Sequence, residues 1–252
     1  VGRERHNEEF MSRTLTIDRL AEVLAPGPGS VISLVGGGGK TTALFALGRQ
    51  LPGRVILSTT TKMGSDRTGG HRPLIAPAHG DLATALSRDR VVLCWREIVD
   101  HRAEGFSAAT VDGWHGLADH VVIEADGSRR RPFKAPAPHE PVVPGGTTTL
   151  VACVGTAAFG ASIDVACHRP EIVAGIAGCE VSDALTPARL AAVIASPQGS
   201  RKDCPGDARF VVLLNQVTHD HAGFVAELDD ALGDAIPVFG VEPFAPGQSP
   251  EA

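Results

Sequence analysis

The sequence predicts an α/β protein in which helices flank a mostly parallel β-sheet. Short apolar runs that suit buried strands alternate along the chain with segments of helical periodicity. A glycine-rich loop joins the first such strand, at 31–35, to a helix at 41–51 and a second strand at 55–57. This order is a βαβ unit, which requires parallel strands joined by a right-handed crossover.

The other elements follow at short intervals. Residues 15–25 predict a short helix because Ile17, Leu20 and Leu24 recur at helical spacing, and a Pro-Gly-Pro-Gly sequence then ends it. Thr186 and Pro187 predict a helix start, since threonine suits the N-cap and proline the first helical position. Further strands are expected at 91–93, 121–125, 150–154, 210–214 and 237–239, and further helices at 81–87, 186–195 and 222–232.

The length of 252 residues fits one large domain, given a typical size of about 150 residues per domain. We expect a single domain over residues 15–252, preceded by a flexible N-terminus at 1–14. Within it, the segment 129–149 is a Pro/Gly-rich insertion that cannot form long regular elements. The segment 160–205 has a more helical pattern than the rest.

Composition excludes several classes of function. The chain has 23 basic and 29 acidic residues and a net charge of −6, which argues against a nucleic-acid-binding protein. No apolar run approaches the roughly 20 residues that span a membrane, and residues 1–13 lack the apolar core of a secretory signal. The cysteines are odd in number and none has CxxC spacing, which favours reduced thiols in a cytoplasmic protein.

The glycine-rich loop is the strongest functional signal. Glycines let backbone amides face an anion, the following helix adds its N-terminal dipole, and a lysine can reach the outer phosphates. The common P-loop would require glycine at position 34, where this chain has Leu34. The loop matches a shorter form, G-x-x-G-K-T, that resembles the loop of Mur-type ligases. We therefore expect a P-loop NTPase-like, three-layer nucleotide-binding domain. The expected phosphate-binding residues are Gly36, Gly37, Gly38, Gly39, Lys40, Thr41 and Thr42.

An acidic loop follows the apolar strand at 121–125. Glu124 and Asp126 are two residues apart, so on a strand they would face the same side. One carboxylate could hold Mg²⁺ with the Thr41 hydroxyl, and the other could orient an attacking water. Lys40, Glu124 and Asp126 are thus the expected catalytic residues, and Thr41, Glu124 and Asp126 the expected Mg²⁺ ligands.

Polar residues follow two other strands. Thr60 and Thr61 come after the strand at 55–57, where they could sense the outermost phosphate. Asn215 follows the strand at 210–214 and could contact a base. GTPases often carry Asn-Lys-x-Asp at such a strand end, but Thr218 stands at the aspartate position, so guanine specificity is not supported. The expected cofactors are ATP or GTP, ATP being favoured, and Mg²⁺.

The irregular segment after the acidic loop suggests a second-substrate site. His139 and Glu140 could form an acid–base pair, although a lone histidine is more often structural or solvated. The run of arginines at 129–131 is either a solvated basic turn or a contact for a phosphate group. The candidate second-substrate residues are Arg129, Lys134, His139, Glu140, His168 and Arg169.

Taken together, these motifs resemble the YqeC family. The matching segments are 36–42, STTTKM at 58–63, EADGS at 124–128, Lys134-Ala135-Pro136, His139-Glu140-Pro141, HRPE at 168–171 and Asn215. The resemblance spans roughly residues 15–240. It implies a P-loop nucleotide-binding protein that acts as an accessory factor for selenium-dependent molybdenum hydroxylases, with the molybdenum cofactor and a hydroxylase client as partners.

Three functions are compatible with these residues. The first is a Mg²⁺-dependent NTPase whose hydrolysis drives a switch on a client protein. The second is a kinase or Mur-like ligase that uses the nucleotide to activate a small-molecule acceptor near Lys134 and His139. The third is a non-enzymatic, nucleotide-gated carrier of the molybdenum cofactor.

Overall fold

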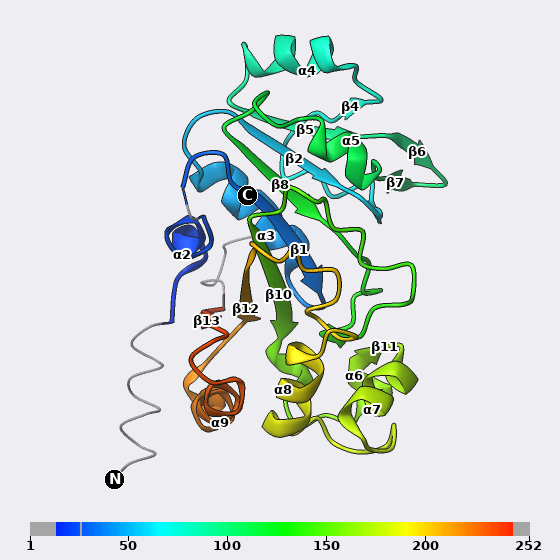
Figure 1. Cartoon of the computed structure of the whole chain (residues 1–252), viewed down its shortest axis with the longest axis vertical. Coiled ribbons are helices and arrows are strands. Elements are labelled where there is room, and N and C mark those ends of the chain that lie inside the picture. The colour runs from blue at the N-terminus through cyan, green and yellow to red at the C-terminus, as the bar shows by residue number, and fades with distance from the viewer. Residues whose placement is uncertain (1–13, 26, 244–252) are drawn as a thin grey trace.

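The computed structural model describes residues 14–25 and 27–243 and confirms the predicted α/β class. Its centre is an eight-stranded parallel sheet with the strand order β13-β12-β10-β1-β8-β2-β5-β4 (Figure 1). The strands are β1 Val31–Gly36, β2 Val55–Thr59, β4 Leu74–Ile75, β5 Val91–Trp95, β8 His120–Glu124, β10 Thr149–Gly155, β12 Arg209–Asn215 and β13 Val238–Val241. The predicted flexible segment 1–14 lies outside the described residues apart from Thr14.

The helices are short and connect successive strands. The segment expected as one helix at 15–25 begins with a 3₁₀ turn at Ile17–Arg19, a frequent feature of helix N-termini. None of the helices in the described part of the chain is long and apolar enough to cross a membrane. They are α2 Leu20–Leu24, α3 Lys40–Gln50, α4 His79–Leu86, α5 Ala108–Asp112, α6 Ile163–Ala166, α7 Pro170–Ala177, α8 Pro187–Ala195 and α9 Ala222–Leu232.

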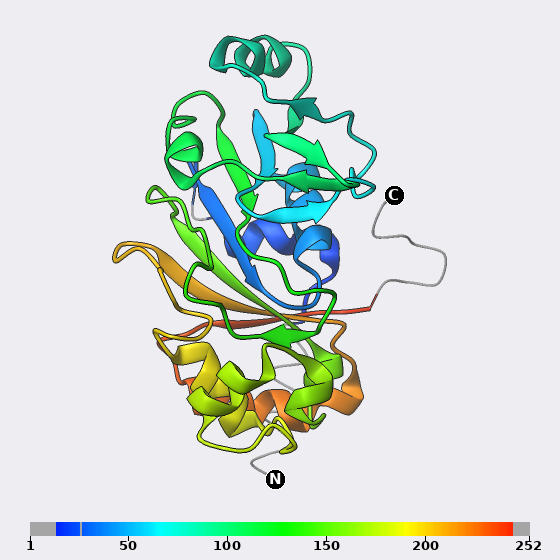
Figure 2. The same ribbon diagram turned by 90° about the vertical axis from the view of Figure 1, so that its right-hand side faces the viewer.

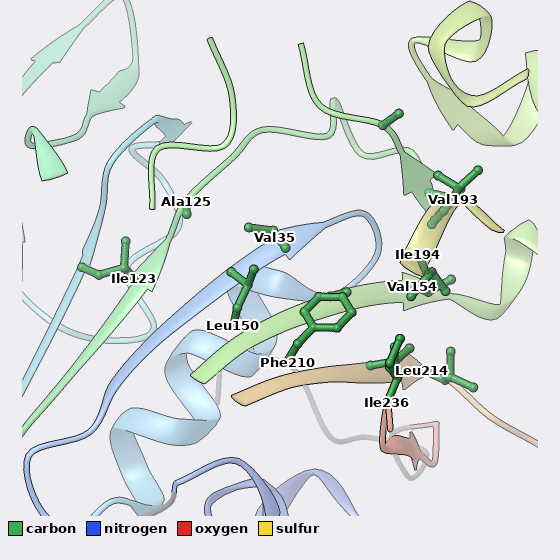
Figure 3. Close-up of a cluster of buried hydrophobic side chains, with 14 of the residues drawn as sticks. Val35, Ile123, Ala125, Leu150, Val154, Val193, Ile194, Phe210, Leu214 and Ile236 are labelled. Carbon is green, nitrogen blue, oxygen red and sulfur yellow. The ribbon is translucent and has the colours of Figure 1, made fainter. Parts of the chain in front are cut away.

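Both faces of the sheet are buried, which explains why its strands are continuous apolar runs rather than alternating ones. In β1, Ile32 and Leu34 belong to the apolar cluster that includes α2 and α3. Val31 and Val35 belong to the opposite cluster, which includes α8 and α9. Figure 3 shows Val193 and Ile194 of α8 beside side chains from the strands in this second cluster. The result is the expected three-layer arrangement of helices, sheet and helices.

Two small sheets lie outside the main one and were not predicted. Strands β3 Lys62–Gly64, β7 Arg102–Glu104 and β6 Glu97–Val99 form an antiparallel sheet. Strands β9 Phe133–Lys134 and β11 Cys167–His168 pair in parallel. Each strand has two or three residues, too few to show an alternating pattern in the sequence. The second pair ties the Pro/Gly-rich segment to the helical segment, whose helices α6, α7 and α8 lie at one end of the molecule (Figure 2).

The topology places a crevice above the centre of the sheet. The chain leaves β1 toward β2 on one side, whereas it leaves β10 toward β12 on the other. In open α/β sheets, ligands bind outside the carboxyl ends of the strands at such a switch point. The loop after β8 must cross β1 to reach β10, because β1 lies between these two strands. The glycine loop, the acidic loop and Asn215 therefore meet at one edge of the sheet.

Candidate functional site

The glycine loop joins β1 to α3 in a conformation that requires glycine. Gly38 and Gly39 have φ angles of 76° and 100°. A Cβ atom would lie 2.5 Å from the amide nitrogen of Gly155 at the first position and 2.6 Å from Nδ2 of Asn215 at the second. Any larger side chain here would meet both backbone strain and steric overlap. The loop thus runs in close contact with the ends of β10 and β12.

The amides available to an anion lie in the second half of the loop. The amide of Gly36 donates to Oδ2 of Asp126 at 3.1 Å, and that of Gly37 donates to the Cys153 carbonyl at 2.9 Å. The amides of the first turn of α3 have no partner within the helix. They lie at the positive end of the helix dipole, the kind of position that favours an anion. The expected cradle of Gly36 to Thr42 therefore narrows to Gly38, Gly39, Lys40, Thr41 and Thr42, which line a cavity of ≈ 370 Å³.

The acidic loop lies against this lysine and threonine. The Thr41 hydroxyl donates to Oε2 of Glu124 at 2.8 Å. The Lys40 ammonium donates to the Gly36 carbonyl and lies 3.9 Å from Oε1 of Glu124 and 3.3 Å from Oδ1 of Asp126. Both acids thus face the same lysine, as their spacing predicted. Strand β8 is the direct neighbour of β1, which explains the close approach.

Burial dominates the electrostatics of this group. Burial disfavours the charged form of Lys40, but Asp126 and Glu124 outweigh it, so the pKa of Lys40 is raised. Burial also raises the pKa of Glu124, against the opposing effects of Lys40 and the Thr41 hydroxyl. A carboxyl group with a raised pKa, beside a lysine in a cavity, is typical of a functional site.

The residues fit Mg²⁺ only together with a phosphorylated ligand. In the described part of the chain, no group of three or more His, Cys, Asp or Glu side chains could hold a metal alone. Mg²⁺ usually keeps several waters and takes one or two carboxylates plus substrate phosphates, which matches Thr41 and Glu124. Oδ1 of Asp126 is buried, and no hydrogen bond to it is found among the described residues, although Lys40 lies nearby. This oxygen could accept a bond from a metal-bound water.

Thr60 and Thr61 do not line the cavity at the glycine loop. The Thr60 hydroxyl donates to the Val142 carbonyl at 2.6 Å, and both threonines line a second cavity of ≈ 490 Å³. The second-substrate candidates Arg129, His139, Glu140, His168 and Arg169 line this cavity too. The structure therefore places both threonines at the second cavity rather than at the cavity of the glycine loop.

Lys134 connects the two cavities from below their surfaces. Its side chain is 1% exposed, and its ammonium lies 3.1 Å from Oδ2 of Asp126 and 2.7 Å from Oε2 of Glu140. The Arg169 guanidinium lies 2.8 Å from the same oxygen of Glu140. Charges of alternating sign thus run continuously from the glycine loop to the second cavity. We call this row the ion-pair chain: Glu124, Lys40, Asp126, Lys134, Glu140 and Arg169.

Neighbouring cations influence the protonation of Glu140 and His168 in the second cavity. Burial opposes ionisation of Glu140, but hydrogen bonds from Lys134 and Arg169 prevail and lower its pKa to about 2. Burial lowers the pKa of His168, and Arg169 and Lys134 lower it further. At neutral pH, Glu140 is therefore a carboxylate and His168 is neutral. His139 is exposed at the cavity wall.

Asn215 lies where the sequence placed it, at the end of β12. Its Nδ2 donates to the Gly38 carbonyl at 2.6 Å, so the side chain supports the glycine loop. It also lines a third cavity of ≈ 260 Å³ together with Ile17, Ala157 and Val241. This cavity adjoins Gly38, Gly39 and Thr42 on the other side of the loop from the acids.

The sequence analysis missed Arg102 as a site residue. Arg102 lies on β7 and lines both the first and the second cavity, as does Lys62 on β3. The small antiparallel sheet brings them there. The motif at 58–63 includes Lys62, but no motif marks Arg102, and the charged–apolar–charged order of Arg102, Ala103 and Glu104 is too short to stand out in the sequence.

The fold and the site together define an α/β protein with a parallel sheet of the P-loop NTPase-like, three-layer kind. A model of the YqeC family, described as "YqeC protein", matches residues 32–171. The chain is also 33% identical over 201 residues to "Uncharacterized protein YqeC" of Escherichia coli (strain K12), across 74% of this chain and 76% of that relative. No solved structure matches the chain significantly. The chain belongs to the YqeC family.

Proposed function

We propose that this protein binds a nucleoside triphosphate with Mg²⁺ and hydrolyses it. The observation that carries the proposal is the 2.8 Å hydrogen bond between Thr41, in the first turn of α3, and Glu124, at the end of the neighbouring strand. A hydroxyl and a carboxylate that Mg²⁺ accepts as ligands thus lie next to the amides of a helix N-terminus, which suit phosphate. Lys40 adds a positive charge at the same point.

Each residue then has a defined role. The amides of residues 38–42 and the Lys40 ammonium bind phosphate oxygens, and Thr41 and Glu124 hold Mg²⁺. The metal supplies charge neutralisation at the phosphates. Asp126 orients Lys40 and accepts a hydrogen bond from bound water. Asp126, the carboxylate that does not hold the metal in this arrangement, is placed to orient the attacking water.

The third cavity is a suitable place for the base of the nucleotide. It lies beside the loop and combines apolar side chains with the amide of Asn215, a suitable setting for a base. The chain has no aspartate at Thr218 to accept from the guanine edge. We therefore place the base in this cavity and expect ATP to bind more tightly than GTP.

For the biological role, the family resemblance supports an accessory factor that matures a molybdenum hydroxylase. Hydrolysis would then act as a switch that reshapes the client or releases the molybdenum cofactor to it. A carrier that binds nucleotide without turnover is the non-enzymatic alternative. The two models differ in how nucleotide hydrolysis responds to client protein. Client protein should accelerate hydrolysis if the protein is a switch, whereas a carrier should not hydrolyse the nucleotide even when client protein is added.

A second candidate function is transfer of a group from the nucleotide to an acceptor, as in a kinase or a ligase. The specific observation in its favour is that Lys62, Arg102, Gly127 and Arg129 line both the first and the second cavity. An acceptor in the second cavity would lie beside the outer phosphates of the nucleotide. Such an enzyme would turn over only with the acceptor present.

The experiment that tests the proposal is phosphate release from ATP, GTP and CTP with Mg²⁺. The full chain is compared with Lys40→Met, which keeps the aliphatic stem and leaves Asp126 its contact with Lys134. Arg88→Gln, an exposed change away from the cavities, is the control. We expect slow release from ATP that stops in Lys40→Met alone. Release that persists in Lys40→Met, or is absent with every nucleotide and client tested, would contradict hydrolysis at this site.

A further inference from the structure

Half of the residues that line the second cavity are charged. Five of them are cationic, namely Lys62, Arg96, Arg102, Arg129 and Arg169, and two are carboxylates, Glu104 and Glu140. Val142 is the one branched aliphatic residue in the wall. A cavity of ≈ 490 Å³ has the size of a small-molecule site, but this lining suits a polar ligand rather than an apolar one.

The two carboxylates are already engaged. Glu104 lies 2.6 Å from the Lys62 ammonium and 2.6 Å from a guanidinium nitrogen of Arg96. Glu140 is held by Lys134 and Arg169. By contrast, among residues 14–25 and 27–243 no carboxylate forms an ion pair with Arg102 or Arg129, and Arg102 donates to the Lys62 carbonyl at 3.3 Å. Neither guanidinium is therefore held at ion-pair distance by a carboxylate of this part of the chain, although Glu124 acts on Arg102 at longer range.

The backbone of the wall is also unusual. Arg129 and Arg169 have φ angles of 49° and 63°, in the left-handed region that non-glycine residues seldom adopt. Such strain tends to cluster at ligand sites, where the surrounding structure holds it. Arg129 follows the acidic loop directly, and Arg169 ends the ion-pair chain. Both strained residues therefore connect the second cavity to the glycine loop.

From these features we propose that the second cavity binds a small molecule that carries a phosphate monoester. Arginine is the side chain that best matches phosphate, because its planar donors form paired, charge-assisted hydrogen bonds with the oxygens. One part of this proposal depends on the proposed function, namely that the ligand serves as acceptor or cargo beside a bound nucleotide. The anion site itself does not require a nucleotide.

The shared wall explains how two anions can lie side by side. Phosphates in adjacent cavities would repel each other, and the repulsion is strong where water is excluded. Lys62, Arg102 and Arg129 line both cavities and lie between these positions. Their charges offset the repulsion, so both anions can be bound at the same time.

The test is calorimetric titration of the full chain with glycerol 3-phosphate, inorganic phosphate and citrate, without nucleotide. Four proteins are compared: the parent chain, Lys40→Met, the double variant Arg102→Gln/Arg129→Gln and the control Arg72→Gln/Arg88→Gln. The four arginines are all exposed, and the control pair removes the same charge away from both cavities.

We expect glycerol 3-phosphate to bind the parent, Lys40→Met and the control equally. Its affinity should fall at least about tenfold in Arg102→Gln/Arg129→Gln, since charge-assisted hydrogen bonds are lost. Loss of binding in Lys40→Met alone would place the probe in the glycine loop and overturn the proposal. So would an equal loss in the control, tighter binding of citrate, or no saturable binding in the parent.

Failure here is distinguishable from failure of nucleotide binding. If glycerol 3-phosphate binds as expected while no nucleotide binds, the second site stands and the proposed function does not. If nucleotides bind and depend on Lys40 while glycerol 3-phosphate does not bind, the reverse holds.

Discussion

The carboxylate of Asp126 lies 3.1 Å from the ammonium of Lys134, and the two side chains are 3% and 1% exposed. The other oxygen of Asp126 lies 3.3 Å from Lys40 at the glycine loop. One carboxylate therefore compensates two buried lysines that belong to two different parts of the site. We therefore expect the ion-pair chain to contribute to the stability of the fold as well as to the charge of the two cavities.

Replacing Asp126 by alanine should destabilise the protein strongly. Removal of one partner from a buried ion pair costs about 3–5 kcal/mol, because a charge remains buried without compensation. Urea unfolding of Asp126→Ala measures the loss. Glu22→Ala, which removes an exposed pair with Arg19, is the control and should change stability far less.

A second change should recover part of that loss. Lys134→Met in the Asp126→Ala background removes one of the two buried lysines that have lost this carboxylate and keeps most of the aliphatic volume. The double variant should be more stable than the sum of the two single changes predicts, which a double-mutant cycle measures directly. Strict additivity would mean that the two groups do not interact in solution.

Gly38→Ala should weaken both stability and nucleotide binding. The left-handed backbone alone costs about 1–2 kcal/mol for an alanine, and the new Cβ would lie 2.5 Å from the Gly155 amide nitrogen. Gly160→Ala is a matched control, because Gly160 has a φ of 69° and nothing within 4 Å of its Cβ position. Thermal unfolding should show the larger loss for Gly38→Ala, and equal losses would mean that the loop relaxes freely.

Glu140 should make stability depend on pH in acid. Its pKa is lowered from 4.5 to about 2 in the folded protein. A carboxyl with a depressed folded pKa stabilises the fold above its unfolded pKa, and that contribution is lost as pH falls through the folded value. The free energy of unfolding should therefore fall between about pH 4.5 and pH 2, and Glu140→Gln should flatten this slope. Glu171→Gln, an exposed change on α7, should leave the slope as it is.

Thr41→Ala should separate metal-dependent from metal-independent binding. Loss of the hydroxyl removes a Mg²⁺ ligand and the hydrogen bond to Glu124, and we expect about tenfold weaker binding of Mg²⁺–ATP, as for the loss of about 1.4 kcal/mol. Binding of ATP in EDTA should change much less. Thr41→Ser retains the hydroxyl and should behave like the parent chain; if Ser fails as Ala does, the methyl group and not the oxygen is what matters.

The central sheet could be predicted from the sequence because its strands are buried on both faces. The continuous apolar runs that end at Val35, Val154 and Leu214 predict buried strands, and the run of glycines predicts the loop after the first of them. The spacing of Glu124 and Asp126 predicted that they would face the same side, and both lie near Lys40, although β8 ends at Glu124 and Asp126 belongs to the loop. Asn215 was found for the same reason, at the end of a strong strand.

The connections between motifs could not be predicted. Lys134 contacts Asp126 and Glu140 through folding of an irregular segment, and the sequence gives no register for such a segment. Arg102 reaches both cavities on a strand of three residues, which is too short for a periodic pattern. Thr60 contacts the Val142 carbonyl because the irregular segment returns to the end of β8, the strand beside β2. This return is a consequence of the tertiary fold and not of local sequence.

Binding of nucleotide phosphates by the glycine loop can be measured by calorimetric titration with ATP, GTP, CTP and adenosine in the presence of Mg²⁺. We expect ATP to bind at one site and adenosine to bind at least about 100-fold more weakly, a difference of about 2.7 kcal/mol. Lys40→Met should abolish this difference, as phosphate binding by the loop requires. Equal affinity for ATP and adenosine, or unchanged ATP binding in Lys40→Met, would contradict it.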